Sequence, residues 1–368
     1  MSVLQGIKVV EIAGLGAAPF TGMMLADMGA EVLLVQRPGS LPAGNTAFDV
    51  SGRGKTAIEL DLKNPADRAT LLKFVAAADV LLEGFRPGVM ERLELAPETL
   101  LAHNSRLIYG RMTGYGQGGE RAQEAGHDIN YISLTGALHA MGQAGGKPTL
   151  PLNLLGDFAG GGLMLAFGVV SALLRRHDTG RGEVIDTAMA DGVTALMGNF
   201  YSARQVGFWS DKRGTNLLDS GAHFYDVYET SDGGHMAVGA IEDKFYQNLL
   251  STLGIEGEQL PAQMDDSQWP AMRSRLAEIF KQKSRDEWTV VFSGREACVT
   301  PVLNIAEAVD DSHLNSRQQF YQAGDARLPM PAPRFQFEPS ATPSPLQVGD
   351  TAAALAAWGC TDAMADGR

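Results

Sequence analysis

Two residues near the middle of the chain have the types and positions that acid–base chemistry requires. His127 lies at the expected start of a helix, where the positive end of the helix dipole favours a neutral imidazole, a general base suited to pH near 7. Asp157 opens a second helix, whose free backbone N–H groups could hold a developing oxyanion. Either residue, like the neighbouring Asp128, could equally serve only as a helix cap. Residue type and spacing leave both interpretations open.

Asp157 is followed by three consecutive glycines in an otherwise apolar helical stretch. Within a helix, Gly160, Gly161 and Gly162 each cost about 1 kcal/mol relative to alanine. Close approach of a bulky ligand or of a partner helix would compensate for that cost. The glycines therefore predict a crowded helix start, whether the neighbour is a substrate or another part of the protein.

A third candidate, Glu242, ends a strand-like run over residues 236–241 and precedes a predicted helix. It could be a further functional carboxylate or a simple helix cap. Spacing in the sequence does not place it near His127.

Arginines follow two of the predicted strands and indicate a phosphorylated ligand. Arg37 comes just after the strand at 31–35, Arg86 follows the strand at 78–82, and Arg92 lies six residues further on. Guanidinium groups pair bidentately with phosphate, so strand-end arginines could converge on one. Each arginine alone could be an ordinary surface residue, but their repetition favours a phosphate-rich nucleotide.

The turn at residues 14–19 resembles a dinucleotide-binding fingerprint and departs from it in two ways. Pro19 replaces the third small residue of the fingerprint. Gln36 and Arg37 stand where a dehydrogenase carries an acidic residue to hold the ribose hydroxyls. Both departures argue against an NAD-dependent dehydrogenase.

A predicted α/β domain positions these residues. Buried strands alternate with helices, which is the pattern of a parallel sheet whose right-handed crossovers bring the strand-end loops to one ligand-binding edge. The predicted strands are 6–13, 31–35, 78–82 and 106–109, with helices at 19–29, 66–77 and 88–102. Further along we predict helices at 127–141 and 157–177, an antiparallel hairpin at 224–240, helices at 267–283 and 285–293, and an extended proline-rich stretch at 329–345.

Composition excludes several classes of protein. The 368 residues, 45% hydrophobic and 20% charged, fit a globular enzyme of two domains. A net charge of −13 argues against nucleic acid as a partner, although the excess acid lies in residues 191–368 and leaves 1–190 near neutral. Cys298 and Cys360 show no metal-ligand or redox spacing, and the apolar stretch at 158–174 is short for a membrane span. With no secretion signal at the N-terminus, we expect a cytoplasmic protein without metal, nucleic-acid or membrane partners.

Taken together, the motifs resemble those of the α-methylacyl-CoA racemases, which belong to the family III CoA-transferase superfamily. They run in consistent order over about residues 1–310, which makes the resemblance more specific than any single motif. Gln36 and His223 depart from the family pattern, and the stretch after about Pro329 matches poorly. The matching runs are VQRPG at 35–39, GFRPGVMERL at 84–93, GHDINY at 126–131, GDFAGGG at 156–162, GAIEDKFY at 239–246 and CVTPVLN at 298–304.

The resemblance implies a fold and an assembly. Members of this family are interlocked homodimers, and each subunit has a large Rossmann-like domain and a smaller α+β domain. The expected divisions here are a large CoA-binding domain at 1–190 with 325–368 returning to it, a linker at 191–220 and a small domain at 221–324. The active site would lie between the large domain of one subunit and the small domain of the other.

The resemblance also implies residue roles. His127 and Asp157 would be the two bases, one on each face of the α-carbon of the substrate. Glu242 would be the carboxylate that partners the histidine, reaching it across the dimer interface. The implied CoA-contacting positions are Arg37, Arg86, Arg92, Gly126, Asp128, Asn130 and Tyr131.

The implied reaction inverts C2 of a 2-methylacyl-CoA thioester by 1,1-proton transfer. An enolate intermediate would be held by backbone N–H groups at the start of the Asp157 helix. Such an isomerase of fatty acid metabolism needs no metal or redox cofactor, because CoA enters as part of the substrate; His223 could alter its acyl pocket. Two alternatives remain: a family III CoA-transferase in which Asp157 attacks the thioester as nucleophile, and a non-catalytic acyl-CoA-binding protein.

Overall fold

The computed structural model describes residues 2–42, 46–338 and 341–360. Contacts within the chain divide it into two units, each with its own hydrophobic core. The first unit comprises Met1–Thr135, Leu152–Leu196 and Ser312–Arg368, and the second comprises Gly136–Pro151 and Met197–Asp311.

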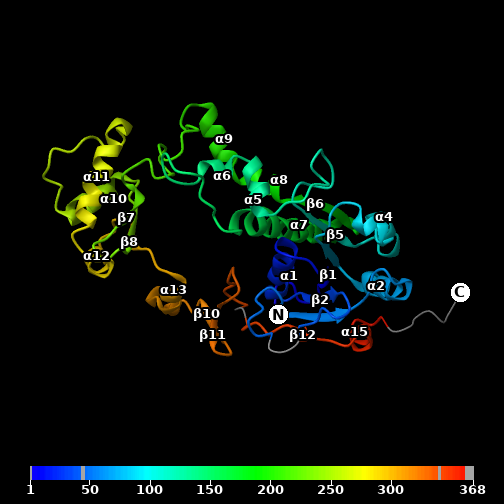
Figure 1. Cartoon of the computed structure of the whole chain (residues 1–368). Coiled ribbons are helices and arrows are strands. Elements are labelled where there is room, and N and C mark those ends of the chain that lie inside the picture. Colours follow the sequence, from blue (N-terminus) through cyan, green and yellow to red (C-terminus); the bar gives the residue numbers. More distant parts are fainter. Residues whose placement is uncertain (1, 43–45, 339–340, 361–368) are drawn as a thin grey trace. The chain divides into compact units, whose positions relative to one another are not determined.

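A parallel sheet forms the centre of the first unit (Figure 1). In the part of the chain that the structure describes, its seven strands follow the order β12-β3-β2-β1-β4-β5-β6. The order reverses between β1 and β4, which opens a crevice at their carboxyl ends. The predicted parallel α/β sheet is thus confirmed, with β3, β6 and β12 added to the predicted strands. The strands are β1 (Lys8–Ile12), β2 (Glu31–Gln36), β3 (Lys55–Glu59), β4 (Val80–Glu83), β5 (Ile108–Thr113), β6 (Glu183–Ala188) and β12 (Gln347–Val348).

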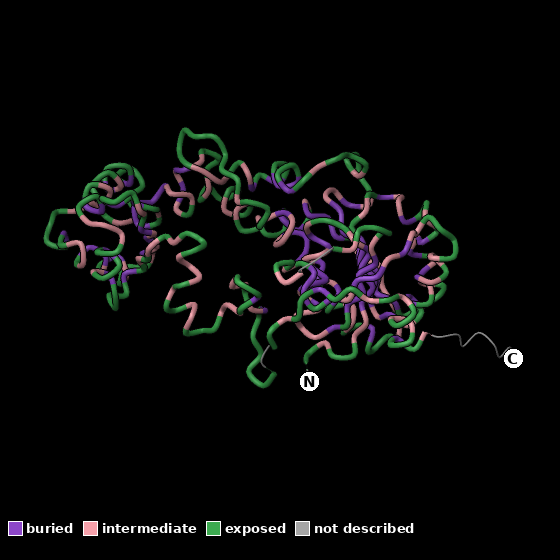
Figure 2. The backbone as a smooth tube through the Cα atoms, turned by 60° about the horizontal axis from the view of Figure 1, so that its bottom comes forward, coloured by how far each residue is buried: buried purple, intermediate pink, exposed green. Residues whose placement is uncertain are grey.

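Helices cover both faces of this sheet, which explains why its strands are almost uniformly apolar. Successive residues point to opposite faces: Val10 packs in one cluster with Leu71 and Phe74, and Val9 packs in another with Leu25 and Leu165. Figure 2 shows the buried residues gathered at the centre of this unit. The first face carries α2 (Pro65–Ala77) and α4 (Pro97–His103), and the second carries α1 (Ala17–Asp27) and α7 (Met164–Thr179).

Two predicted helices are each broken into two shorter ones. The backbone of Glu94 has a φ of 59°, in the left-handed region, so the stretch 88–102 cannot be one helix. Gly136 has a φ of 75° and divides the stretch 127–141 in the same way. The observed helices are α3 (Val89–Arg92) and α4 in the first case, and α5 (Asp128–Leu134) and α6 (Ala137–Ala140) in the second.

The glycine-rich helix begins as a π-helix, η1 (Leu154–Leu163), and continues as α7. A Cβ on Gly160 would lie 2.5 Å from Val193 Cγ2 in α8 (Met189–Leu196), and one on Gly162 would lie 2.6 Å from Phe20 Cδ1 in α1. The predicted crowding is confirmed, and partner helices are its cause. The continuous helix Leu154–Thr179 is long and apolar enough to cross a membrane by length and composition alone, so the prediction that its apolar stretch is too short was wrong. This helix contacts α1, α8, β5 and β6, while Phe167, Val170 and Leu174 on it are exposed.

The second unit contains a three-stranded antiparallel sheet, β7-β8-β9, within the described residues. The predicted hairpin at 224–240 is confirmed as β7 (Tyr225–Glu229) and β8 (His235–Gly239). Aromatic rings fill its core, where Tyr228 stacks on Phe280. The remaining elements are β9 (Val299–Pro301), α9 (Gly198–Gln205), α10 (Asp243–Leu253), η2 (Asp266–Gln268), α11 (Trp269–Phe280), α12 (Arg285–Phe292) and α13 (Ile305–Asp310).

The division between the units differs from the predicted domain boundaries. Residues 136–151 belong to the second unit rather than to the large domain, and residues 197–220 belong to it rather than forming a linker. Arg213 explains both differences, because its guanidinium donates to His139 O at 2.7 Å and to Gly146 O. Residues 312–324 lie in the first unit instead of the small domain.

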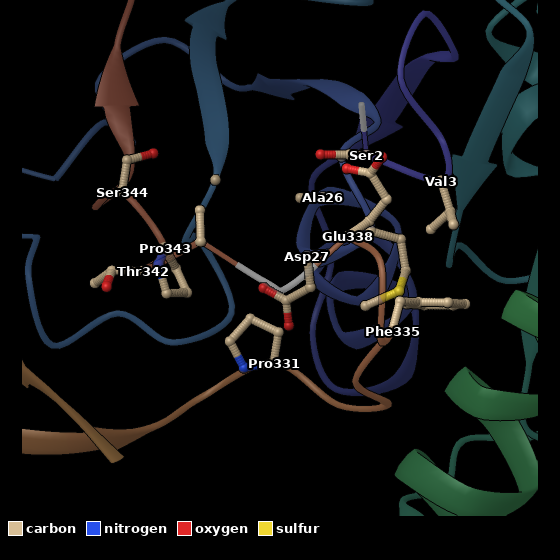
Figure 3. Close-up of a pocket in the computed structure, with 14 residues that line it drawn as sticks. Ser2, Val3, Ala26, Asp27, Pro331, Phe335, Glu338, Thr342, Pro343 and Ser344 are labelled. Carbon is tan, nitrogen blue, oxygen red and sulfur yellow. The ribbon is translucent and has the colours of Figure 1, made fainter. Parts of the chain in front are cut away.

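The C-terminal segment returns to the first unit. Arg53 Nη1 donates to Pro329 O at 2.6 Å, and the Gly54 N–H donates to Ser344 O at 2.8 Å. Residues from both ends of the chain line a small hollow of about 270 Å³. Figure 3 shows Ser2 and Ser344 on opposite sides, with Asp27 and Pro331 between them. The segment contains α14 (Ser312–Ser316), the hairpin β10 (Phe320–Ala323) and β11 (Ala326–Pro329), then β12 and α15 (Thr351–Ala357).

Candidate active site

A hollow lies at the carboxyl edge of the parallel sheet, where the strand order reverses. Its volume is about 430 Å³, and the loops after β1, β4 and β5 line it together with the starts of α5 and η1. This is the edge at which α/β sheets bind ligands, as the alternating pattern predicted. Lining residues include Gly14–Gly16, Gly84–Pro87, Met112–Tyr115, Gly126, His127, Tyr131 and Asp157.

His127 stands at the start of α5 and faces this hollow. Its backbone is extended, and its N–H donates to Asn130 Oδ1 at 3.0 Å. The imidazole is exposed. The prediction that His127 begins a helix is confirmed, and Asn130 uses its side-chain oxygen to hold His127 in place.

Asp157 lies in the first turn of η1 and lines the same hollow. Its Oδ2 accepts a hydrogen bond from Asn153 Nδ2 at 3.1 Å. Burial raises the pKa of the Asp157 carboxyl, and the charge of Asp128 adds to this effect, while Asn153 and His127 act in the opposite direction. A Cβ on Gly16 would lie 2.9 Å from Asp157 Oδ2, so the turn before α1 approaches this carboxylate closely.

Asp128 has a different position from its neighbours. The side chain is buried, and its Oδ2 accepts from the Gly156 N–H at 2.6 Å and from the Asp157 N–H at 2.8 Å. We expected N–H groups at this helix start to hold an enolate. The Asp128 carboxylate already accepts hydrogen bonds from these two N–H groups, so the expectation is wrong for both of them. Asp128 therefore orients the start of η1, which carries Asp157.

Three of the residues that the resemblance associates with CoA line the hollow: Arg86, Gly126 and Tyr131. Arg86 is exposed, in the turn after β4. The Tyr131 hydroxyl donates to Gly126 O, and its ring meets the edge of Tyr115 with ring centroids 4.9 Å apart. Tyr131 thus fixes the loop before His127, while Arg86 presents a free charge.

Arg37 and Arg92 are exposed at the same edge of the sheet but do not belong to the lining of this hollow. Arg37 follows β2 directly, and Arg92 ends α3. Among the described residues, neither Arg86 nor Arg92 has an ion-pair partner. The first unit therefore presents cationic side chains near the ends of β2 and β4.

Glu242 and His223 lie in the second unit. Glu242 is exposed at the start of α10, where its carboxylate caps no backbone N–H. His223 is buried, and its Nε2 lies 2.8 Å from the Tyr246 hydroxyl. Burial, reinforced by the charge of Arg273, lowers the pKa of His223 to about 4, so it is a neutral core residue at physiological pH. The expectation that His223 could alter an acyl pocket gains no support from this position.

No three His, Cys, Asp or Glu side chains gather into a metal-binding arrangement within the described parts of the chain. Cys298 is exposed in the second unit, and Cys360 is partly buried beside Trp358. The two thiols thus belong to different units.

Sequence reasoning missed two contributors to the site. Asn153 lies four residues before Asp157, a spacing at which helical side chains meet, and this signal could have identified it. Tyr115 follows β5, the next strand in the alternation after β4, and strand-end position is the corresponding signal.

Comparison with known proteins defines the family. A model of CoA-transferase family III matches residues 4–351. The chain belongs to this family. It is 49% identical over 331 residues to the α-methylacyl-CoA racemase of Mus musculus, covering 90% of this chain and 85% of that protein. It is 48% identical over 333 residues to the α-methylacyl-CoA racemase of Homo sapiens, covering 90% and 86%.

A solved structure shows the same fold. The crystal structure of a CAIB/BAIF family protein from Brucella suis superimposes with a TM-score of 0.83 at 25% identity, covering 97% of this chain and 99% of that one. The family resemblance predicted from the motifs is confirmed.

Proposed function

We propose that this protein is an isomerase that inverts the configuration at C2 of 2-methylacyl-CoA thioesters. The observation that carries the proposal is that His127 and Asp157, two different proton-transfer groups, line one hollow at the ligand-binding edge of a family III fold. Two relatives that are 49% and 48% identical to this chain, over alignments that cover 90% of it, are named α-methylacyl-CoA racemase.

The chemistry follows from two bases facing one carbon. One base removes the proton from C2 of the thioester, and the electron pair moves onto the carbonyl oxygen to give a planar enolate. The other base, carrying a proton, delivers it to the opposite face, and the carbonyl re-forms with inverted configuration. Each group must be deprotonated in one direction and protonated in the other, and the raised pKa of Asp157 brings its proton affinity closer to that of an imidazole.

The enolate oxygen needs a hydrogen-bond donor or a positive charge. Because Asp128 occupies the N–H groups of Gly156 and Asp157, these two amides serve the protein rather than the enolate. Proton transfer between the two bases and C2 changes no oxidation state, so the reaction needs no electron acceptor, and CoA enters as a portion of the substrate.

The first unit would hold the CoA portion. Arg86 lines the hollow, and Arg37 and Arg92 lie at the same sheet edge. Three guanidinium groups suit the phosphates of CoA, which they can bind bidentately. Residues 1–190 have a net charge near zero, so the excess acid of the chain lies outside the half that contains these arginines.

The active form would be a homodimer. Four exposed apolar residues follow one another at spacings of four, three and four, so they form one apolar stripe from the end of η1 along α7: Leu163, Phe167, Val170 and Leu174. An exposed stripe of this kind suits contact with a second copy. The exposed carboxylate of Glu242 would then reach His127 from the partner subunit.

Hydrogen exchange tests the proposed reaction. One epimer of a 2-methylacyl-CoA is incubated with the protein in deuterated water, without any carboxylic acid acceptor. We expect loss of optical activity together with deuterium at C2, and a fall on the order of a hundredfold or more for His127→Ala and Asp157→Asn.

Two other results would contradict the proposal. CoA transfer to an added carboxylic acid without exchange at C2 would identify a transferase with Asp157 as nucleophile. Binding of acyl-CoA with neither exchange nor transfer would identify a binding protein. The variant Asn248→Ala serves as control, because Asn248 lies in the second unit and donates to Glu296 O on an exposed surface.

A further inference from the structure

A bridge of three charged residues lies beneath the turn that carries Arg86. Arg111 Nε donates to Glu83 Oε1 at 3.0 Å, and Arg111 Nη2 lies 2.8 Å from Glu91 Oε1. Glu83, the last residue of β4, is directly paired in register with Arg111 of β5. Both side chains are buried, at 1% and 9% exposure, whereas that of Glu91 is 40% exposed. We call these three residues the Arg111 bridge.

The Arg111 bridge is attached to both ends of the turn at residues 84–88. At the first end, Glu83 Oε2 accepts from the Phe85 N–H at 2.7 Å. At the other end, Glu91 belongs to α3, the short helix that also contains Arg92. Arg111 thus connects the last residue of β4 to the helix that follows the turn.

Two further hydrogen bonds hold the backbone of this turn. Arg86 O accepts from the Val89 N–H at 3.1 Å, and Pro87 O accepts from Gln123 Nε2 at 3.2 Å. Gly84 and Arg86 are exposed. The Arg111 bridge therefore adds a charged connection between the two ends of a turn that apolar packing also anchors, since Met90 of α3 is fully buried and Phe85 packs against the same core cluster.

The bridge also controls the local charge. Glu91 lies next in sequence to Arg92, and its carboxylate would be a competing anion for any guanidinium that receives phosphate. Pairing with Arg111 holds that carboxylate on the sheet side. Burying Glu83 and Arg111 costs desolvation, so the bridge is a weak source of stability. Its geometry suits a role in holding the turn.

We propose that Arg111 is a positioning residue for CoA binding: through Glu83 and Glu91 it holds the β4–α3 turn so that Arg86 and Arg92 face the phosphates. This inference rests on the proposed function, because it requires CoA to bind at this edge of the sheet. Arg111 itself does not line the hollow. It acts through the two exposed arginines.

Two variants separate positioning from simple electrostatics. Arg111→Lys keeps the charge, but one ammonium group cannot reproduce the fixed fork that reaches both carboxylates. Glu91→Gln removes a negative charge beside the arginines, so electrostatics alone predicts tighter CoA binding, whereas loss of positioning predicts weaker binding. Glu183→Gln is the matched control, because the Glu183 side chain is 44% exposed against 40% for Glu91, is also paired with an arginine, and lies beside Ile108 at the opposite end of β5.

The measurements compare a substrate with phosphates and a substrate without them. KM and kcat are determined for a 2-methylacyl-CoA and for the corresponding acyl-pantetheine, and thermal melting confirms that each variant is folded. We expect Arg111→Lys and Glu91→Gln to raise KM for the CoA thioester on the order of tenfold, with kcat unchanged. Neither variant should change KM for the pantetheine thioester, and Glu183→Gln should change nothing.

Calorimetric titration with free CoA gives a second result that does not depend on turnover. An unchanged or lower KM for acyl-CoA in both variants, or equal losses with both thioesters, would overturn the positioning role. If the unmodified protein binds free CoA but catalyses no exchange at C2, the proposed function fails, and weaker CoA binding by both variants would still support the Arg111 bridge. Absence of any CoA binding would overturn both.

Discussion

Asp157 owes its proton affinity to the way its neighbours are arranged. Asp128, buried 28 residues away in sequence from Gly156, uses its carboxylate to hold the amides at the start of η1. This fixes the helix start and places a second negative charge near Asp157. Burial is the largest cause of the raised pKa of Asp157, and the charge of Asp128 adds to it. The Asp128 carboxylate therefore holds the helix start that carries Asp157 and also contributes to the raised pKa of Asp157.

Replacing Asn153 by alanine should shift the pH dependence of the reaction. Asn153 donates to Asp157 Oδ2 and lowers the pKa of that carboxyl, so its removal raises the pKa further. In the direction that uses Asp157 as the base, the acidic limb of the kcat/KM profile should move to higher pH, since more base is protonated at any low pH. Initial rates of deuterium uptake at C2 across the pH range measure this. An acidic limb that stays in place, or moves to lower pH, would contradict the role of Asn153.

Residue type predicted some of these features and not others. The start of a helix at His127 followed from its local context, and strand-end arginines followed from the alternation of strands and helices. The hydrogen bonds of Asp128 to the start of η1 could not be predicted from the sequence. An aspartate that caps its own helix and one that caps a second helix 28 residues away leave the same local pattern. Such a choice is made by tertiary contacts.

At the scale of elements, α1 and η1 are held against each other and against the sheet. Lys55 Nζ in β3 pairs with Glu11 in β1 at 2.7 Å and donates to Pro19 O in α1 at 2.9 Å, with both charged side chains buried. Thr21 Oγ1 in α1 donates to Gly162 O in η1 at 3.0 Å. These bonds keep the turn before α1 close to Asp157.

The glycines of η1 should resist substitution. Gly160→Ala would place a Cβ 2.9 Å from Val193 N and 3.0 Å from Met189 O, and backbone atoms cannot move aside as a side chain can. We expect a loss of about 1–3 kcal/mol in the free energy of unfolding, measured by chemical denaturation. Gly198→Ala, at the start of α9 with no atom within 4 Å of the new Cβ, should cause no loss. Equal stability of the two variants would show that helix packing does not require Gly160.

The π-helical form of η1 illustrates a limit of sequence periodicity. The apolar spacing of residues 157–177 fits an ordinary helix, and η1 nevertheless has a wider turn where three glycines approach α1 and α8. The glycines predicted close contact but could not predict the backbone geometry that satisfies it. That geometry depends on neighbours contributed by distant segments.

At the scale of the whole molecule, strand order determines where chemistry can occur. The reversal between β1 and β4 brings the loops of both strands to one hollow, and later segments up to Met189 of α8 then supply its remaining side chains. Alternation of strands and helices predicted this edge. It did not predict that residues 136–151 leave the first unit, because the Arg213 contacts that join them to residues 197–220 span about 70 positions.

The apolar stripe on α7 yields a prediction about assembly. Phe167 is 72% exposed at the centre of the stripe, and leaving four large apolar side chains in water is unfavourable. Phe167→Glu would place a charge in the contact with a second copy, and an unpaired charge buried there costs several kcal/mol. We therefore expect the unmodified protein to have the mass of a dimer by light scattering, and the variant to have that of a monomer. Val290→Glu, at an exposed position on α12 in the second unit, should remain dimeric.

Measurements of exchange at C2 test whether the active site needs the dimer. If Glu242 of one copy serves His127 of the other, monomeric Phe167→Glu should lose exchange at C2 although His127 and Asp157 are unchanged. Mixing Glu242→Gln with His127→Ala then provides a sharper measurement, because a mixed dimer contains one complete site when the carboxylate comes from the partner. Recovery of exchange in the mixture after subunit reassembly is the expected outcome. A fully active monomer, or a mixture with no more activity than its two components, would show that each chain completes its own site.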